Sequence, residues 1–108
     1  MNFRDWQQLS PEEAARELHR RVGLLPPRQQ RAAIATLPSE TRLGEALARA
    51  DRRQPLGAVP YFLKDLFDVA GQPTFGGSTF LPEVRPTPER DSEMVLAMQA
   101  AGAVLAGK

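Results

Sequence analysis

The stretch from Pro60 to Gly71 constrains the fold of this chain more than any other. Its large side chains alternate with a period of two, which is typical of a half-buried extended segment. One face carries Phe62, Lys64 and Leu66, and the other carries Tyr61, Leu63, Phe67 and Val69. The pattern therefore predicts a strand around Lys64, with an amine between two apolar neighbours.

Lys64 is the one candidate general base that the sequence offers. An ammonium group on an apolar face loses hydration, so it must find an anionic partner or give up its proton more readily. We therefore expect Lys64 to be mostly buried, with its amine directed toward the turn at residues 76–78. The alternative is that this face is solvated and that Lys64 only flanks an edge strand.

Residues 1–54 predict a helical segment with three helices. A capping box, Ser10-Pro-Glu-Glu13, starts a helix that can end at Gly23. A second helix is expected from Pro27 to Thr36, and a third follows a cap at Ser39. The third has apolar residues at helical spacing: Leu43, Ala46, Leu47 and Ala50.

Two side chains of this half attract functional interpretations that we set aside. Trp6 is expected to pack under the first helix, and His19 to be a solvated helix residue without a catalytic partner.

The arginines of residues 1–54 could form a nucleic-acid face, but they are spread around several helices among acids and lack aromatic stacking residues. Solvated helix faces are the favoured interpretation.

Residues 55–108 predict the start of a sheet. The glycines of residues 71–78 indicate a turn, and the prolines of residues 79–90 indicate an ordered surface loop. Asp91 is expected to cap a helix that ends near Ala101, before a short apolar strand at residues 103–106. Strand, helix and strand predict a right-handed βαβ crossover with parallel strands. The fold class is thus α/β, with N-terminal helices followed by part of a mixed sheet, and the buried last strand suggests a truncated domain.

Composition excludes several classes of protein. At 108 residues the chain can form one small domain. A formal net charge of +1 suggests neither nucleic acid nor a membrane surface as partner, and the absence of cysteine rules out disulfides and thiolate chemistry. One histidine cannot build a metal site alone, and no stretch resembles a secretory signal or a bilayer span. We expect a cytoplasmic protein without metal or cofactor, and its oligomeric state is left open.

Several motifs in order resemble the opening of the amidase signature family of amide hydrolases. They are Leu56-Gly-Ala-Val-Pro60, Leu63-Lys-Asp-Leu-Phe-Asp-Val-Ala-Gly71, Pro73-Thr74, Gly77-Ser78, and then Pro88, Asp91, Val95 and Ala101-Gly-Ala-Val-Leu-Ala-Gly-Lys108. The resemblance covers roughly Leu43 to Lys108. Ala58 departs from it, because glycine usually stands at this position in the family.

The resemblance implies an enzyme that hydrolyses carboxylic amide C–N bonds. Such enzymes use a serine nucleophile, a second serine in a cis peptide, and a lysine that accepts a proton through that second serine. By motif position Lys64 is this catalytic lysine, and both serines would follow Lys108. Ser78 lies in a different motif. The chain alone is therefore expected to be inactive, and its small-molecule amide substrate and substrate-binding residues stay unknown.

Two other classes of function remain open. The first is a stand-alone interaction module whose helical half docks a partner and which has no catalytic activity. The second is an RNA-binding helical domain, which would show steeply salt-dependent binding.

Overall fold

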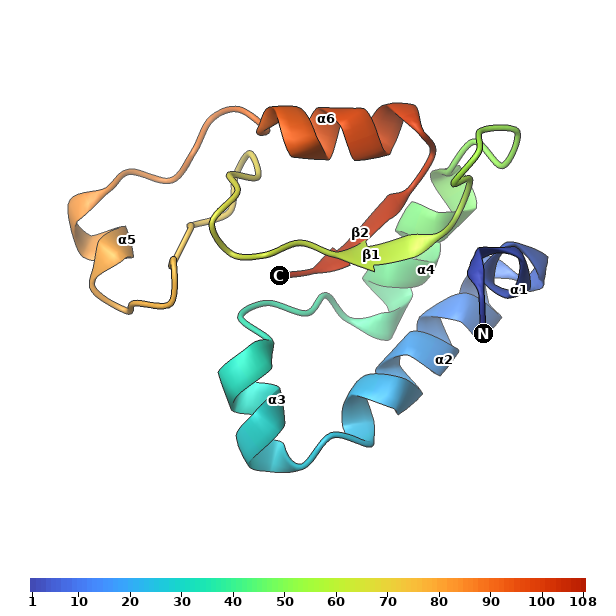
Figure 1. Ribbon diagram of the computed structural model, residues 1–108, viewed down its shortest axis with the longest axis horizontal. Coiled ribbons are helices and arrows are strands. Elements are labelled where there is room, and N and C mark those ends of the chain that lie inside the picture. Colours follow the sequence, from blue (N-terminus) through green and yellow to red (C-terminus); the bar gives the residue numbers. More distant parts are fainter.

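A computed structural model describes residues 1–108 as six helices and a parallel pair of strands (Figure 1). In chain order the elements are α1 (Phe3–Gln8), α2 (Pro11–Gly23), α3 (Pro27–Ala33), α4 (Glu40–Arg49), β1 (Pro60–Phe62), α5 (Leu81–Val84), α6 (Glu93–Ala100) and β2 (Val104–Gly107). The strands pair with Pro60 opposite Val104 and Tyr61 opposite Leu105, and an irregularity after Tyr61 shifts the register so that Phe62 lies opposite Gly107. The predicted α/β class and the parallel connection through a helix are confirmed.

The helix starts follow their sequence signals. The Ser10 hydroxyl accepts from the Glu13 amide at 3.2 Å, and the Glu13 carboxylate accepts from the Ser10 amide at 2.9 Å. The Ser39 hydroxyl accepts from the Arg42 amide at the start of α4, without a reciprocal bond. The prediction of three helices before Pro55 was one short, because Asn2 and Asp5 form a further capping box that starts α1.

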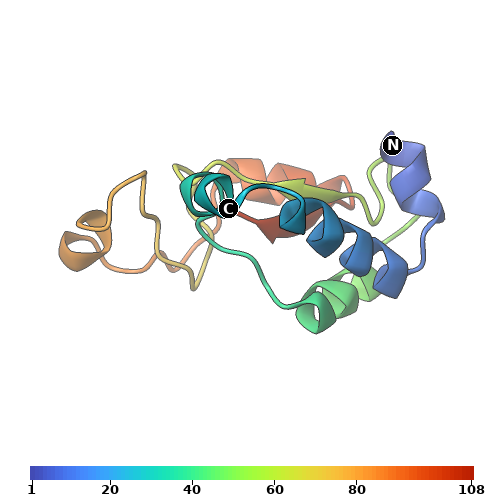
Figure 2. The same cartoon turned by 90° about the horizontal axis from the view of Figure 1, so that it is seen from below.

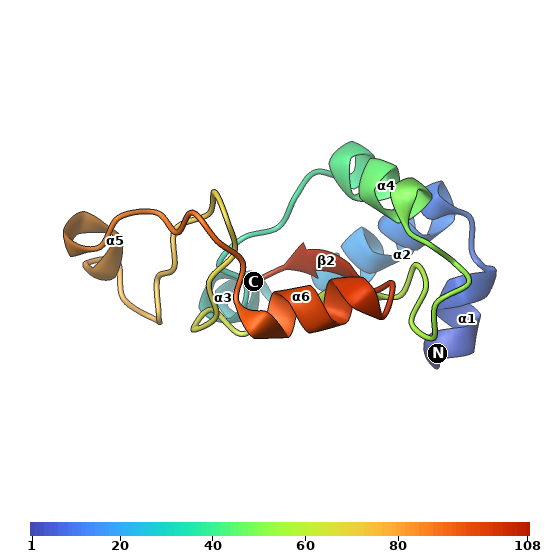
Figure 3. The same ribbon diagram turned by 90° about the horizontal axis from the view of Figure 1, so that it is seen from above.

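The two faces of the sheet are covered by different helices (Figure 3). Val104 and Ala106 of β2 pack with α2 and α4 in the larger core, whose helical members are Ala14, Ala15, Leu18, Leu43 and Leu47. Leu105 points to the opposite face and packs against a smaller cluster of Leu63, Val69 and Val95, the last from α6. The side chains of β2 thus alternate between two faces, each covered by helices.

The segment after α3 follows the end of β2. The Ala35 and Thr36 amides donate to the Lys108 carbonyl at 2.7 and 3.1 Å, and the Lys108 amide donates to the Thr36 carbonyl at 3.0 Å. On the other side, the Leu63 amide donates to the Gly107 carbonyl at 2.9 Å. These bonds explain why α3 ends at Ala33 rather than Thr36, since the backbone of residues 35 and 36 is bonded to Lys108 instead of continuing the helix.

Residues 79–90 extend away from the two layers, and α5 lies at their tip (Figure 2). The predicted surface loop is therefore present, with one short helix in it. None of the helices in the structure combines the length and the apolar character that a bilayer span needs.

Trp6 and His19 both contact other parts of the helical half of the chain. Trp6 is half-buried and packs against the larger core, as expected. His19 is half-buried as well, and its Nε2 lies 3.0 Å from the Pro38 carbonyl oxygen. The expectation that His19 is a solvated residue was therefore wrong, because the chain returns over α2 on its way from α3 to α4.

Ala58 has the left-handed backbone conformation that favours glycine. Its φ is 60°, and its side chain is only 1% exposed within the larger core. The backbone conformation typical of glycine is thus kept although the residue is alanine. An L-residue in this region costs about 1–2 kcal/mol.

Replacing Ala58 by glycine should therefore change stability by less than about 1 kcal/mol. Relief of the left-handed strain offsets the loss of a buried methyl group, about 0.8 kcal/mol, and the entropy of the added glycine. Ala15→Gly is the matched control, because Ala15 is fully buried in α2, where the change should cost about 2 kcal/mol. Urea unfolding of both variants measures the difference, and equal losses would show that Ala58 carries no strain.

Candidate active site

Lys64 lies two residues beyond the end of β1, on the exposed face of the extended segment. The strand predicted around Lys64 is shorter than expected, because β1 ends at Phe62 and a turn begins at Asp65. The predicted alternation holds as far as Leu66: Phe62, Lys64 and Leu66 are exposed, and Leu63 is buried. It fails at Phe67, which was expected on the side of Leu63 but is 36% exposed. The expectation that Lys64 itself is mostly buried was wrong for this chain. Its face is apolar, as predicted, but neither α6 nor α2 and α4 cover it.

Asp65 connects three parts of the chain. Its Oδ2 accepts from the Phe75 amide at 3.1 Å, and its carbonyl accepts from the Gly76 amide at 2.9 Å. Its Oδ1 lies 2.6 Å from the Nζ of Lys108. The residue next to Lys64 thus fixes the end of β1 to the glycine turn and to the end of β2.

Lys108 is the buried lysine of the structure. Its side chain is fully buried and that of Asp65 is 13% exposed. The contact is an ion pair rather than a well-directed hydrogen bond, and the ammonium has no other partner. Sequence reasoning did not single out Lys108 for a role, although its Gly-Lys motif was the available signal.

The two lysines line one open cavity of about 460 Å³. Lys64, Asp65 and Lys108 form one side of it, and Gly77, Ser78 and Thr79 of the glycine turn contribute another part. The remaining lining residues are Arg31, residues 32–35, Leu63 and Phe75. Lys64 therefore opens onto the same space as the turn toward which its amine was predicted to point.

Of the four serines, only Ser78 lines this cavity. Its hydroxyl accepts from the Phe80 amide at 3.2 Å and forms no hydrogen bond with a lysine. Ser10 and Ser39 cap helices, as expected, and Ser92 lies at the start of α6. No three His, Cys, Asp or Glu side chains come close enough to hold a metal ion.

Asp68 holds the surface loop to the strand region. Its carboxylate accepts from Arg85 at 2.6 and 3.0 Å and from the Thr74 hydroxyl at 2.8 Å. The Arg85 guanidinium, followed by Thr74, lowers the pKa of Asp68 below its ordinary value. Asp91 does not cap α6 as predicted, because its carboxylate accepts from the Ala70 amide at 2.8 Å instead.

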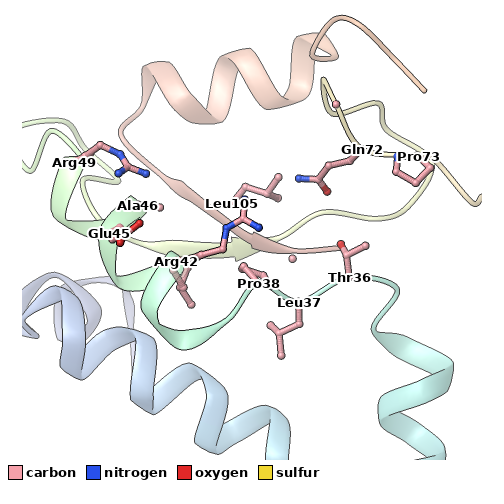
Figure 4. Close-up of a pocket in the computed structure, with 13 residues that line it drawn as sticks. Thr36, Leu37, Pro38, Arg42, Glu45, Ala46, Arg49, Gln72, Pro73 and Leu105 are labelled. Atoms are coloured by element: carbon pink, nitrogen blue, oxygen red, sulfur yellow. The ribbon is translucent and has the colours of Figure 1, made fainter. Parts of the chain in front are cut away.

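A second pocket, of about 600 Å³, lies between α4 and the edge of β2 (Figure 4). Arg42, Glu45 and Arg49 of α4 face Leu105 of β2 and the turn at residues 71–73 across it. Neither lysine lines this pocket. We therefore place the candidate active site at the smaller cavity, where the amines and the glycine turn meet.

Known proteins identify the family of this chain. The amidase family profile matches residues 16–108, so the chain belongs to the amidase family. A glutamyl-tRNA(Gln) amidotransferase subunit from Anaeromyxobacter dehalogenans (strain 2CP-C) is 44% identical over 61 residues, 56% of this chain and 12% of that protein. AtzE, a 1-carboxybiuret hydrolase subunit from Pseudomonas sp. (strain ADP), is 40% identical over 60 residues, 56% of this chain and 13% of that protein.

Solved structures have the same fold over nearly the whole chain. A chain from a vestigial protein complex, described as revealing the origins of an s-triazine catabolic enzyme, superposes with a TM-score of 0.71 and 28% identity over 93% of this chain and 22% of that one. Kluyveromyces lactis allophanate hydrolase superposes with a TM-score of 0.68 and 26% identity over 100% of this chain and 19% of its own. The α/β architecture is that of amidase-signature enzymes, and the 108 residues span a small part of each relative.

Proposed function

We propose that this chain forms the N-terminal part of an enzyme that hydrolyses carboxylic amide C–N bonds, and that Lys64 is its catalytic lysine. In this proposal the serine nucleophile and the serine that relays its proton lie on a segment outside the 108 residues. The substrate is a small-molecule amide. The match to the amidase family over residues 16–108, which includes the Lys-Asp motif, is the observation that carries the proposal.

The surroundings of Lys64 support this role. Phe62 and Leu66, the apolar neighbours on the same face as the lysine, are 41% and 59% exposed, so the amine stands on an uncovered apolar face. An exposed apolar face of this kind is one that a further segment of chain could bury. When further chain covers it, the ammonium form of Lys64 loses hydration and its neutral form is favoured.

A neutral amine in such a place supplies what amide hydrolysis requires. A serine hydroxyl is a weak nucleophile at neutral pH, and a base must take its proton as it attacks the carbonyl carbon. Lys64 would accept that proton through the second serine and return it to the leaving amine. The glycine turn that lines the cavity leaves room beside the amine for this relay.

The 108-residue chain alone should give no turnover of simple aryl or alkyl amides. Acyl transfer needs a nucleophile, a base and donors for the oxyanion, and loss of even one donor costs about 100- to 1000-fold. The measurement compares the chain, its Lys64→Ala variant and the complete reading frame that contains these residues. Turnover by the chain alone that disappears in Lys64→Ala would show that the active site is complete here, and an inactive complete reading frame would refute amide hydrolysis.

A further inference from the structure

The chain uses lysine twice and arginine twelve times, and both lysines line the same cavity. They differ in environment. The side chain of Lys108 is fully buried and paired with Asp65, whereas Lys64 is exposed. One amine of the cavity is therefore buried and paired, and the other is exposed and unpaired. The carboxylate of Asp65, which follows Lys64 in the sequence, is paired with Lys108.

The nearby carboxylates have no free oxygen for Lys64. Asp65 uses Oδ1 for Lys108 and Oδ2 for the Phe75 amide. Asp68 is held by Arg85 and Thr74. Lys64 forms no ion pair within 4.0 Å, although Asp65 follows it directly.

We propose that Asp65 and Lys108 are positioning residues for the catalytic lysine, and this rests on the proposed function. Lys108 occupies the carboxylate that would otherwise capture the Lys64 amine. The same pair fixes the end of β1 to the glycine turn at Phe75 and Gly76. Lys64 is therefore left as the unpaired amine, which is the one that can exchange a proton with a serine.

A buried ammonium such as that of Lys108 is better suited than an exposed arginine to keep the Asp65 carboxylate away from Lys64. The pair is shielded from solvent, so salt does not screen it strongly, and breaking it would leave an uncompensated charge inside the protein. Lys108 therefore stays bound to Asp65 while Lys64 remains free. Lys64 and Asp65 line the same cavity, so an Asp65 without this partner would share that space with the remaining lysine.

Amine labelling of the 108-residue chain tests the pairing directly. The chain has three amines, so limited acetylation followed by mass spectrometry reports each one separately. We expect Lys64 to react as a free amine and Lys108 to be protected by at least an order of magnitude. Asp65→Asn should remove the protection of Lys108, and the matched change Asp68→Asn should retain it. Equal reactivity of the two lysines in the native chain would overturn the proposal.

Lys108→Met provides a result that unfolding cannot imitate. The methionine fills the buried position without charge, and the released Asp65 should pair with Lys64 and slow its acetylation several-fold. Unfolding would instead leave Lys64 reactive, and circular dichroism checks that the variant is folded. An unchanged or faster reaction of Lys64 in a folded Lys108→Met chain would refute the proposed role of the pair.

Kinetics of variants of the complete enzyme distinguish a failure of the positioning role from a failure of the proposed function. Lys108→Met alone should lower kcat by at least an order of magnitude with little change in KM, and adding Asp65→Asn should restore most of the loss, since no free carboxylate then remains. No recovery in a folded double variant would reject the positioning role even if Lys64→Ala is inactive. A fully active Lys64→Ala enzyme would reject the proposed function itself, whatever the labelling shows.

Discussion

Replacing Lys64 by alanine should lower the turnover of the complete enzyme by several orders of magnitude. In the proposed mechanism this amine is the final acceptor of the nucleophile's proton, so its loss leaves the serine relay without a base. Binding of the amide does not depend on that proton transfer, and KM should change far less than kcat. Steady-state kinetics on a simple amide measures both.

Lys64→Arg is the informative companion to Lys64→Ala. Arginine keeps the positive charge and a long side chain, but its guanidinium stays protonated and cannot act as a base. It should therefore be as inactive as the alanine variant. Both variants should melt like the native 108-residue chain, because Lys64 is exposed and forms no ion pair. A near-normal rate for Lys64→Ala would remove the catalytic assignment.

Replacing Gly102 by alanine should have the largest effect on stability. Gly102 has φ +85°, and a Cβ there would lie 2.7 Å from the Gln54 Cβ and 3.0 Å from both the Asp51 carbonyl oxygen and the Gly57 Cα. Left-handed strain costs about 1–2 kcal/mol and forced overpacking about 1–3 kcal/mol. We expect a loss of about 3 kcal/mol, which for a domain of this size lowers Tm by roughly 12–24 °C.

Three other glycines separate the two causes of that loss. Gly71 has φ +77° and open space around its Cβ position, so Gly71→Ala measures backbone strain alone. Gly57→Ala measures the clash alone, with a Cβ 2.5 Å from the Arg52 Cα and no positive φ. Gly23→Ala has neither, and because Gly23 is the last residue of α2 the change should be neutral or slightly stabilising. If the Gly102→Ala chain had the same Tm as the Gly23→Ala chain, the turns of residues 51–58 and 101–103 could separate without loss of stability.

Local signals in the sequence predicted most of the fold. Ser10 and Glu13 specify the start of α2 because the cap is made within four residues, and the alternation from Phe62 to Leu66 specifies which side chains share a face. Asn2 and Asp5 carry the same kind of signal for α1, but no apolar stripe follows them to mark the helix. The predictions from such local signals that were wrong concern the ends of helices and short elements such as α1.

The arrangement of the site depended on contacts that local patterns do not report. The partner of Asp65 is 43 positions away in the sequence, and only the parallel pairing of β1 with β2 brings Lys108 to it. The exposure of Lys64 depends on which helices cover the sheet, and α6 lies on the face of Leu63 and Leu105 instead. An alternating pattern identifies two faces of a strand but does not indicate which one is covered.

The hydrogen bonds between Thr36 and Lys108 have a consequence for the order in which the chain folds on the ribosome. The two residues are separated by 72 positions, and α3 contributes no fully buried side chain to the core. Helices α2 and α4 can associate early, since they lie close in sequence, but the backbone of residues 35 and 36 finds its hydrogen-bond partner only when residue 108 has been synthesised. At about 5–20 residues per second this delay is roughly 4–14 s. During that interval the segment around α3 carries unpaired backbone amides, and a nascent-chain chaperone or an exposed strand edge of another chain would meet it in that state.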